Sequence, residues 1–494
     1  MIKFSIFWRN LKEKLFSKKE QGKDSPELSP PQIPEASFSV SSRSIKASSQ
    51  RDPYFVQIGL DFGTSYTKCI CRDVMTDKAW VHVSQKYRGQ EFPFLIPGAL
   101  HFRDGMISHV ENPEIHYPEK GLYHLKHALV KVALCEWDDP VLVPYRHASN
   151  QSDINELTKF VEACAVYYLG GVLGDVRNEI RRRFPDFGAL TQDYMAVNLA
   201  VPVAYAEMPQ VNAIYNRVLV EAWGLAENLS DHLLIHLSEL ENLRRDSRRI
   251  RAQSLDEECF IYPEVSANVQ GFVRSRVSSP GMYIFCDTGA STVDQSVFIF
   301  IRRNHTEHLA YLHGSILPLG SSYIEHLAAL RAGKMDWQTL EMWRKRKEAG
   351  EKELELQKAR EWIASQLSQS TIATLAFTKQ KLFVKDDLNG IRVIFGGGGH
   401  CDNPYKNAVM RAFSCDLFRE RIRPDIVGLP IPRDLELEAH ESRWMRRLSV
   451  AYGLSFEKSE LSSFTYPVEL KTPEPHQIWP RRMVIDDAPT KDQC

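Results

Sequence analysis

From Tyr54 onward, the chain alternates between short apolar runs and longer amphipathic stretches. Runs rich in β-branched and aromatic residues predict strands, and apolar residues spaced three and four apart predict helices. Strands are predicted at 54–60, 67–72, 98–110, 194–201, 282–300 and 391–395, with turns inside 98–110 and 282–300. Helices are predicted at 157–183, 211–223, over much of 323–381, from about 404, and at 443–456. This mixture predicts an α/β protein.

Two segments before the folded region have a different pattern. Residues 1–19 predict a basic amphipathic helix, because Phe4, Phe7, Trp8 and Leu11 share one helical face among lysines. Residues 20–52 are rich in Ser, Pro and charged residues and predict a disordered linker. We expect the helix either to dock on a partner protein or to lie at an anionic membrane surface, and docking is slightly favoured.

Composition narrows the class of protein. Lys plus Arg total 62 against 63 Asp plus Glu, so the net charge does not favour binding to nucleic acid. The Arg- and Glu-dense segment 239–258 has mixed signs and predicts a solvated helix or surface insertion. The nine cysteines include no C-x-x-C pair, and no apolar run of about twenty residues or secretory signal occurs. These features favour a cytoplasmic protein without a transmembrane segment.

A glycine turn follows the first predicted strand. It contains Asp61, Gly63, Thr64, Ser65 and Tyr66 and leads into a second strand. Such a turn can aim backbone N–H groups at a phosphate, with the aspartate facing a metal ion. Taken alone, an ordinary hairpin turn is an equally good interpretation.

A second turn of the same design follows the apolar strand at 283–285. Its residues are Asp287, Gly289, Ala290, Ser291, Thr292 and Asp294. Two such turns facing each other could grip one polyphosphate from both sides. Farther on, a strand runs into Gly396, Gly397, Gly398 and Gly399 and then His400, a run on which a purine and ribose could lie directly against backbone.

These three segments, in this order, resemble the two phosphate motifs and the adenosine motif of the actin, heat-shock chaperone and sugar-kinase superfamily. The DnaK-type chaperones match best, and their similarity extends over about 55–456. Further similar segments are 167–170, 196–205, 222–225, 263–267, 319–321 and 447–453. The resemblance implies a two-lobed actin-like ATPase fold, a duplicated ribonuclease H-like fold, with ATP and Mg2+ between the lobes. It places lobe I at 53–275 with 443–456 returning to it, lobe II at 276–440, and a Pro-containing tail at 457–494.

The resemblance also implies roles for individual residues. Asp61 and Asp287 would hold Mg2+ through its waters. Glu264 would position the attacking water, with help from Asp294, and Lys126 would stabilise charge on the phosphoryl group, although an exposed helix lysine is an equally good interpretation of Lys126. The phosphate and adenosine contacts would come from Gly63, Thr64, Ser65, Tyr66, Gly289, Ala290, Ser291, Thr292, Gly320, Gly396, Gly397, Gly398 and His400.

Some features depart from the chaperone pattern. His400 stands where the family has an arginine after its glycines, which weakens the expectation for adenine. Extra sequence near 171–193 and 226–262 predicts surface insertions. The segment after Phe456 is too short for a peptide-binding domain, which needs more than ~100 residues. We therefore expect a slow Mg-dependent ATPase switch that acts through an unidentified partner or client. The alternatives are an actin-like filament protein, a nucleotide sensor with little turnover and, least favoured, a small-molecule kinase.

Overall fold

The computed structural model describes residues 51–467, apart from several short internal gaps. The gaps are 89, 113, 151–152, 203–207, 230–233, 252–257, 276–277, 304–305, 383–387, 389, 400–402, 416–422, 438–441 and 466. The predicted helix 1–19, almost all of the predicted linker 20–52, His400 and most of the tail therefore lie outside the described residues. Contacts divide the chain into two units, 1–52 and 53–494, and the described sheets and helices all belong to the second unit.

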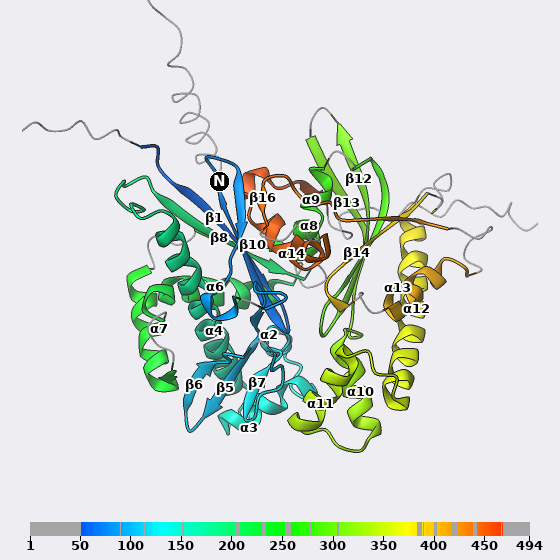
Figure 1. Cartoon of the computed structure of the whole chain (residues 1–494), viewed down its shortest axis with the longest axis horizontal. Helices are drawn as coiled ribbons and strands as arrows, with labels where there is room; N and C mark the ends of the chain where they lie inside the picture. The colour runs from blue at the N-terminus through cyan, green and yellow to red at the C-terminus, as the bar shows by residue number, and fades with distance from the viewer. Residues whose placement is uncertain are drawn as a thin grey trace, which may run out of the picture. The chain divides into compact units, whose positions relative to one another are not determined.

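The structure is an α/β protein with three sheets, which confirms the predicted class (Figure 1). The first large sheet has the order β10-β8-β1-β2-β3-β16, with β4 beside β2. Its strands are β1 (Phe55–Phe62), β2 (Tyr66–Asp73), β3 (Lys78–Val81), β4 (Ile96–Pro97), β8 (Tyr194–Val201), β10 (Cys259–Pro263) and β16 (Leu435–Glu436).

The second large sheet has the order β15-β14-β11-β12-β13-β17. Its strands are β11 (Gly281–Thr288), β12 (Val293–Arg303), β13 (Thr306–Leu317), β14 (Arg392–Gly396), β15 (Asp425–Val427) and β17 (Ser463–Thr465). A smaller sheet, β7-β5-β6-β9, consists of β5 (Ala99–Arg103), β6 (Met106–His109), β7 (Gly121–Tyr123) and β9 (Leu234–His236).

The two large sheets repeat one topology. In each, three sequential strands form an antiparallel meander, β1-β2-β3 or β11-β12-β13. Two later strands then add in parallel beside the first strand: β8 and β10 in one sheet, β14 and β15 in the other. A short parallel strand from the C-terminal part of the chain completes the opposite edge of each sheet. The same arrangement is therefore built twice.

Helices cover both faces of the large sheets. The helices are α2 (Leu125–Ala133), α3 (Val143–Ser149), α4 (Ile154–Arg183), α6 (Pro209–Leu229), α7 (Leu237–Arg251), α8 (Glu264–Asn268), α9 (Gln270–Val273), α10 (Ser322–Arg331), α11 (Trp337–Glu348), α12 (Leu354–Lys381), α13 (Asn403–Ala412) and α14 (Ser442–Leu454). Apolar side chains of α2, α4 and α6 form one core with the first sheet, and those of α10, α12 and α13 form another with the second sheet.

The helices α8, α9 and α14 lie between the two large sheets (Figure 1). Glycines permit this close packing. A Cβ on Gly453 of α14 would lie 1.8 Å from the carbonyl oxygen of Ala267 in α8, and a Cβ on Gly59 of β1 would lie 2.1 Å from that of Ala451. The backbone of α14 therefore rests directly on α8 and β1, with no side chain between them.

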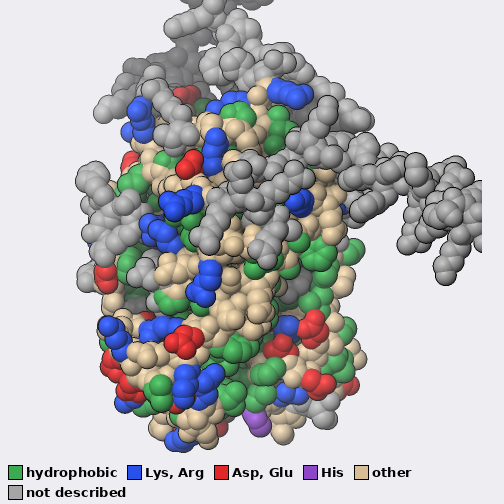
Figure 2. Space-filling view, turned by 90° about the vertical axis from the view of Figure 1, so that its right-hand side faces the viewer, with side chains coloured by type: hydrophobic (Ala, Val, Ile, Leu, Met, Phe, Trp, Pro, Cys, Tyr) green, Lys and Arg blue, Asp and Glu red, His purple; other side chains and the backbone are tan. Residues whose placement is uncertain are grey.

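The surface carries no segregated charge on the face seen in Figure 2. Basic, acidic and hydrophobic side chains are interspersed there. Residues 237–251 form α7, so the first part of the predicted charged segment 239–258 is helical. Within the described part of the chain, no helix is both long and apolar enough to cross a membrane.

Candidate functional site

The first glycine turn joins β1 to β2. The paired strands end at Phe62 and Thr67, and the turn lies between them. A Cβ on Gly63 would lie 2.2 Å from the carbonyl oxygen of Tyr66, so a side chain cannot be accommodated there. On the outer side, Gly98 donates its N–H to the carbonyl of Ser65 at 2.7 Å. The turn is thus anchored through a carbonyl.

The second turn joins β11 to β12 and is anchored in the same way. Gly320 donates its N–H to the carbonyl of Ser291 at 3.0 Å, and Ser322 donates its N–H to that of Ala290 at 2.8 Å. A Cβ on Gly320 would lie 2.2 Å from the carbonyl oxygen of Ala290. Gly320 therefore holds the turn from behind.

Both turns are hydrogen-bonded to neighbouring segments through their carbonyl groups, and several of their backbone N–H groups remain free within the part of the chain that the structure describes. Among the described residues, the N–H groups of Thr64, Ser65, Ala290 and Ser291 donate no hydrogen bond. The hydroxyl of Ser291 is buried and is likewise without a partner in the described structure. Successive free N–H groups in a turn form a concave donor site suited to an anion.

The strands that carry the turns place charged side chains in matching positions. In the first hairpin Asp61 lies opposite Lys68, and their Oδ2 and Nζ atoms are 2.5 Å apart. In the second hairpin Asp287 lies opposite Asp294, so two carboxylates face each other. Like charges at directly opposed positions repel, which favours a protonated carboxyl in this pair.

Two further charged side chains complete the group. Lys126 of α2 donates to Glu264 at the start of α8, with 2.8 Å between Nζ and Oε2. Asn268 of α8 donates its Nδ2 to Oδ2 of Asp287 at 2.7 Å, and its own Oδ1 accepts from the hydroxyl of Ser449 in α14. Asp294 keeps one buried oxygen, Oδ1, for which the described residues provide no hydrogen-bond donor.

The electrostatics of this group are dominated by burial and by excess negative charge. Burial, followed by the charges of Glu264 and Asp61, raises the pKa of Asp287 to about 7. Burial and the charges of Glu264 and Asp287 also raise the pKa of Asp294 well above its usual value. Burial alone would lower the pKa of Lys126, but neighbouring carboxylates, Glu264 foremost, hold it above its usual value.

The glycine run lies beside the second turn. Gly396 ends β14 opposite Asp287, and Gly397 has a positive φ of 78°. A Cβ on Gly397 would lie 2.2 Å from Oδ1 of Asp287, and one on Gly399 would lie 2.6 Å from Cγ2 of Thr288. The run therefore packs against the end of β11 only because it lacks side chains.

One cavity of about 1340 Å³ brings these parts together. The predicted site residues that line it are Asp61, Gly63, Thr64, Ser65, Tyr66, Lys126, Glu264, Asp287, Gly289, Ala290, Ser291, Thr292, Asp294, Gly397 and Gly398. Gly320 and Gly396 are not in its lining; the first packs behind the second turn, and the second packs against Phe285. His400 lies outside the described residues.

The cavity has lining residues that the sequence analysis did not predict. They include Lys68 and, from the helices α10, α11, α12 and α14, the charged residues Glu325, Arg344, Lys345, Lys347, Glu348, Arg360, Arg446 and Arg447. Lys68 follows the first turn at the position that pairs with Asp61, which strand register alone would have revealed. The helical residues have no local sequence signal, because they reach the cavity only through tertiary packing.

A loop closes one side of the cavity against α11. Oε2 of Glu341 accepts the backbone N–H groups of both His116 and Tyr117 at 3.2 Å. Tyr117 also donates its hydroxyl to Oε1 of Glu325 in α10 at 3.1 Å, and Arg344 of α11 donates to the carbonyl of Glu114. Segments 114–117 and α10–α11 are thus connected by several hydrogen bonds.

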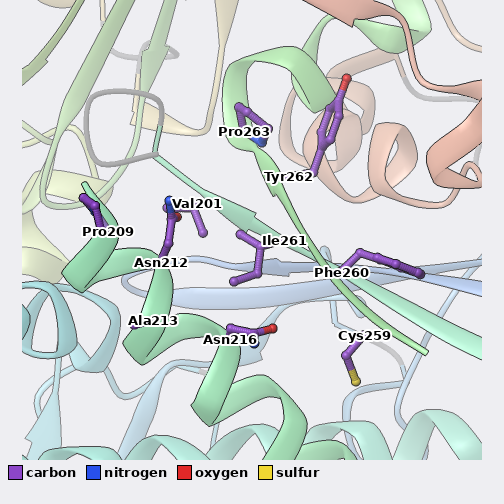
Figure 3. A pocket seen from close by; sticks show the side chains of 10 residues that line it. All are labelled: Val201, Pro209, Asn212, Ala213, Asn216, Cys259, Phe260, Ile261, Tyr262 and Pro263. Carbon is purple, nitrogen blue, oxygen red and sulfur yellow. The ribbon is translucent and has the colours of Figure 1, made fainter. Parts of the chain in front are cut away.

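A smaller cavity of about 500 Å³ lies between β10 and the start of α6 (Figure 3). Its lining is Val201, Pro209, Asn212, Ala213, Asn216, Cys259, Phe260, Ile261, Tyr262 and Pro263. In Figure 3, Ile261 points toward α6, whereas Phe260 and Tyr262 point to the other side of the strand. Among the described residues, this lining contains no carboxylate or ammonium group.

Within the described region, no group of three or more His, Cys, Asp or Glu residues is arranged to hold a metal ion. Comparison with models of known protein families finds no family that matches this chain. A comparison with curated proteins likewise finds no match.

Proposed function

We propose that the larger cavity binds ATP together with Mg2+, and that the protein is a chaperone-like ATPase switch that acts through a partner protein. The observation that carries the proposal is the pair of glycine turns. Both present free N–H groups, and both line one cavity with Asp61, Asp287 and Asp294. Free donors on two sides suit a polyphosphate, which carries several anionic oxygens.

The repeated topology supports a specific fold. Two sheets of the same strand order, with α8, α9 and α14 between them, are what a duplicated, two-lobed actin-like ATPase would have. In this interpretation lobe I is 53–275 with 443–456, and lobe II is 276–440. The glycine run beside the second turn then receives the nucleoside.

The charges of the cavity fit a divalent cation held through its waters. Around the two turns, the carboxylates of Asp61, Glu264, Asp287 and Asp294 outnumber the ammonium groups of Lys68 and Lys126, whereas the remaining charged lining residues belong to other segments. This excess of carboxylates is consistent with the raised pKa of Asp287 and with the unpartnered oxygen of Asp294. Mg2+ prefers oxygen ligands and keeps several waters, so Asp61 and Asp287 would hold it without a three-residue cluster. Such an ion would neutralise charge on the phosphates.

The remaining roles belong to the protein's own side chains. Glu264, held by Lys126, is placed to orient a water molecule, and the free oxygen of Asp294 is available to accept a proton from it. Lys126 is placed to offset negative charge on the transferred phosphoryl group. Ser291 and Thr292 would donate to the phosphate oxygens.

The position of α14 supports a switch. This helix contacts β1 and β2 of the first sheet and β14 of the second, so a change at the cavity reaches both sheets. If the protein is a switch, small-angle scattering will show a more compact particle with a nonhydrolysable ATP analogue and Mg2+ than without nucleotide. Identical curves would contradict the switch.

A nucleotide sensor with little turnover is a second candidate, favoured by one contact. The ion pair of Lys68 with Asp61 supplies a cation where Mg2+ would bind, which suits binding without a metal. Hydrolysis assays of the wild type and Asp294→Asn with Mg2+ separate the two. Loss of turnover in the variant supports the ATPase, whereas ATP binding in EDTA with no turnover supports the sensor. Equal hydrolysis by both proteins would contradict the assigned site.

A further inference from the structure

Arg447 occupies the end of the cavity formed by the glycine run. It lies on α14, and its Cζ is 4.4 Å from the centre of the Phe92 ring, a cation–π distance. A Cβ on Gly398 would lie 3.2 Å from both Cζ and Nη1 of Arg447. Phe92 and Gly398 also line the cavity, so the guanidinium is held between two of its walls.

The guanidinium of Arg447 differs from several other cations of the cavity in its contacts with the described residues. Three lysines of the cavity are paired: Lys68 with Asp61, Lys126 with Glu264, and Lys347 with Glu325. For Arg447, the described residues provide neither an ion pair nor a hydrogen bond to its side chain. A planar group with several N–H donors is thus fixed in place by an aromatic ring, with its donors unused.

Resting on the proposed function, we propose that Arg447 is the residue that recognises the nucleotide base. The phosphate-binding turns account for the triphosphate, and the adjoining glycine run leaves room for the nucleoside beside this guanidinium. Because Phe92 fixes its plane, Arg447 can offer N–H groups to ring nitrogens of a purine with little loss of side-chain freedom. It would supply the base contact from α14, outside the glycine run.

The test separates the base from the phosphates. Calorimetry would measure binding of ATP and of inorganic tripolyphosphate, each with Mg2+, to the full-length wild type and to Arg447→Ala. We expect the variant to lose about tenfold in affinity for ATP, the loss of a charge-assisted hydrogen bond, while tripolyphosphate changes by less than about twofold. Arg447→Lys keeps the charge without the planar group and should also bind ATP more weakly, which covers the case of an unstable alanine variant.

Arg446→Ala provides the charge control. Arg446 is the neighbouring residue on the same helix; it is exposed and also lines the cavity. Its replacement by alanine removes the same charge as Arg447→Ala. Its effect on ATP should be well below that of Arg447→Ala. An equal loss for ATP and tripolyphosphate in Arg447→Ala, or no loss for ATP, would overturn the proposal. A wild type that binds neither ligand would instead overturn the proposed function, and this inference with it.

Discussion

The charge at Asp287 gives the most direct test of the site's electrostatics. Asp287→Asn keeps the shape of the side chain, and the amide oxygen can still accept from Nδ2 of Asn268. The substitution removes the one carboxyl whose pKa rises from 3.8 to about 7 through burial and the neighbouring Glu264 and Asp61. It therefore removes the titration of that group, together with the part of the raised pKa of Asp294 that the charge of Asp287 causes.

The raised pKa of Asp287 determines how the stability of the folded protein depends on pH. Below about pH 4 the carboxyl is protonated in both folded and unfolded protein, so it has no effect on stability. Between pH 4 and 7 the unfolded chain releases the proton and the folded protein keeps it, so stability falls as pH rises. At ~1.4 kcal/mol per pH unit, a pKa raised from 3.8 to about 7 lowers the free energy of unfolding by roughly 4 kcal/mol in total. Roughly two-thirds of this decrease falls between pH 5 and 8.

Denaturant titrations at pH 5, 6, 7 and 8, without nucleotide or metal, would measure this effect. We expect the free energy of unfolding of the wild type to fall by roughly 2–3 kcal/mol more than that of Asp287→Asn over this range. Asp425→Asn, which changes an exposed carboxyl on β15 of the same sheet, should follow the wild-type slope. Parallel curves for wild type and Asp287→Asn would refute the argument.

Three further outcomes are expected. Lys126→Met should reduce ATP hydrolysis by about 100-fold while leaving the fold intact, as measured by phosphate release; an unchanged rate would exclude a catalytic role. Gly453→Ala should lower the free energy of unfolding by at least about 2 kcal/mol because its Cβ would overlap α8, whereas Gly428→Ala, with nothing within 4 Å, should change it by less than about 1 kcal/mol. Glu341→Ala should speed amide exchange in the loop 114–117, whose N–H groups it accepts; unaltered exchange would mean that this loop is held by other contacts.

Local features of the sequence were enough to predict several strands and turns of the fold. The strand predicted at 194–201 coincides with β8, and the turn predicted inside 98–110 lies at Asp104 and Gly105, both at positive φ, where it joins β5 to β6. Each depends on residues close together in the chain, where periodicity and turn chemistry are strong signals. Most of the fifteen predicted site residues that share one cavity come from the two turns and the glycine run, which are local motifs, whereas Lys126 and Glu264 were predicted only through the resemblance to the chaperones.

Features set by long-range packing were not predicted. Strand β10 is five residues long and gave no strand pattern of its own; it forms by pairing with β8. Within the predicted irregular tail, Ser463–Thr465 form β17 by pairing with β13. Gly98 anchors the first turn, and Arg447 reaches the cavity from the far end of the chain. Such roles depend on which distant segments meet, and local pattern carries little of that information.

The amide of Asn268 joins a carboxylate of one sheet to a helix that rests on the other. One side of it donates to Asp287 on β11, and the other accepts from Ser449 on α14. The backbone of α14 packs directly on β1 at Gly59 and on α8 at Gly453, so a shift of Ser449 would change these contacts as well. Neutralising Asp287 at the end of β11 would therefore be communicated, through two hydrogen bonds, to a helix that packs on the first sheet.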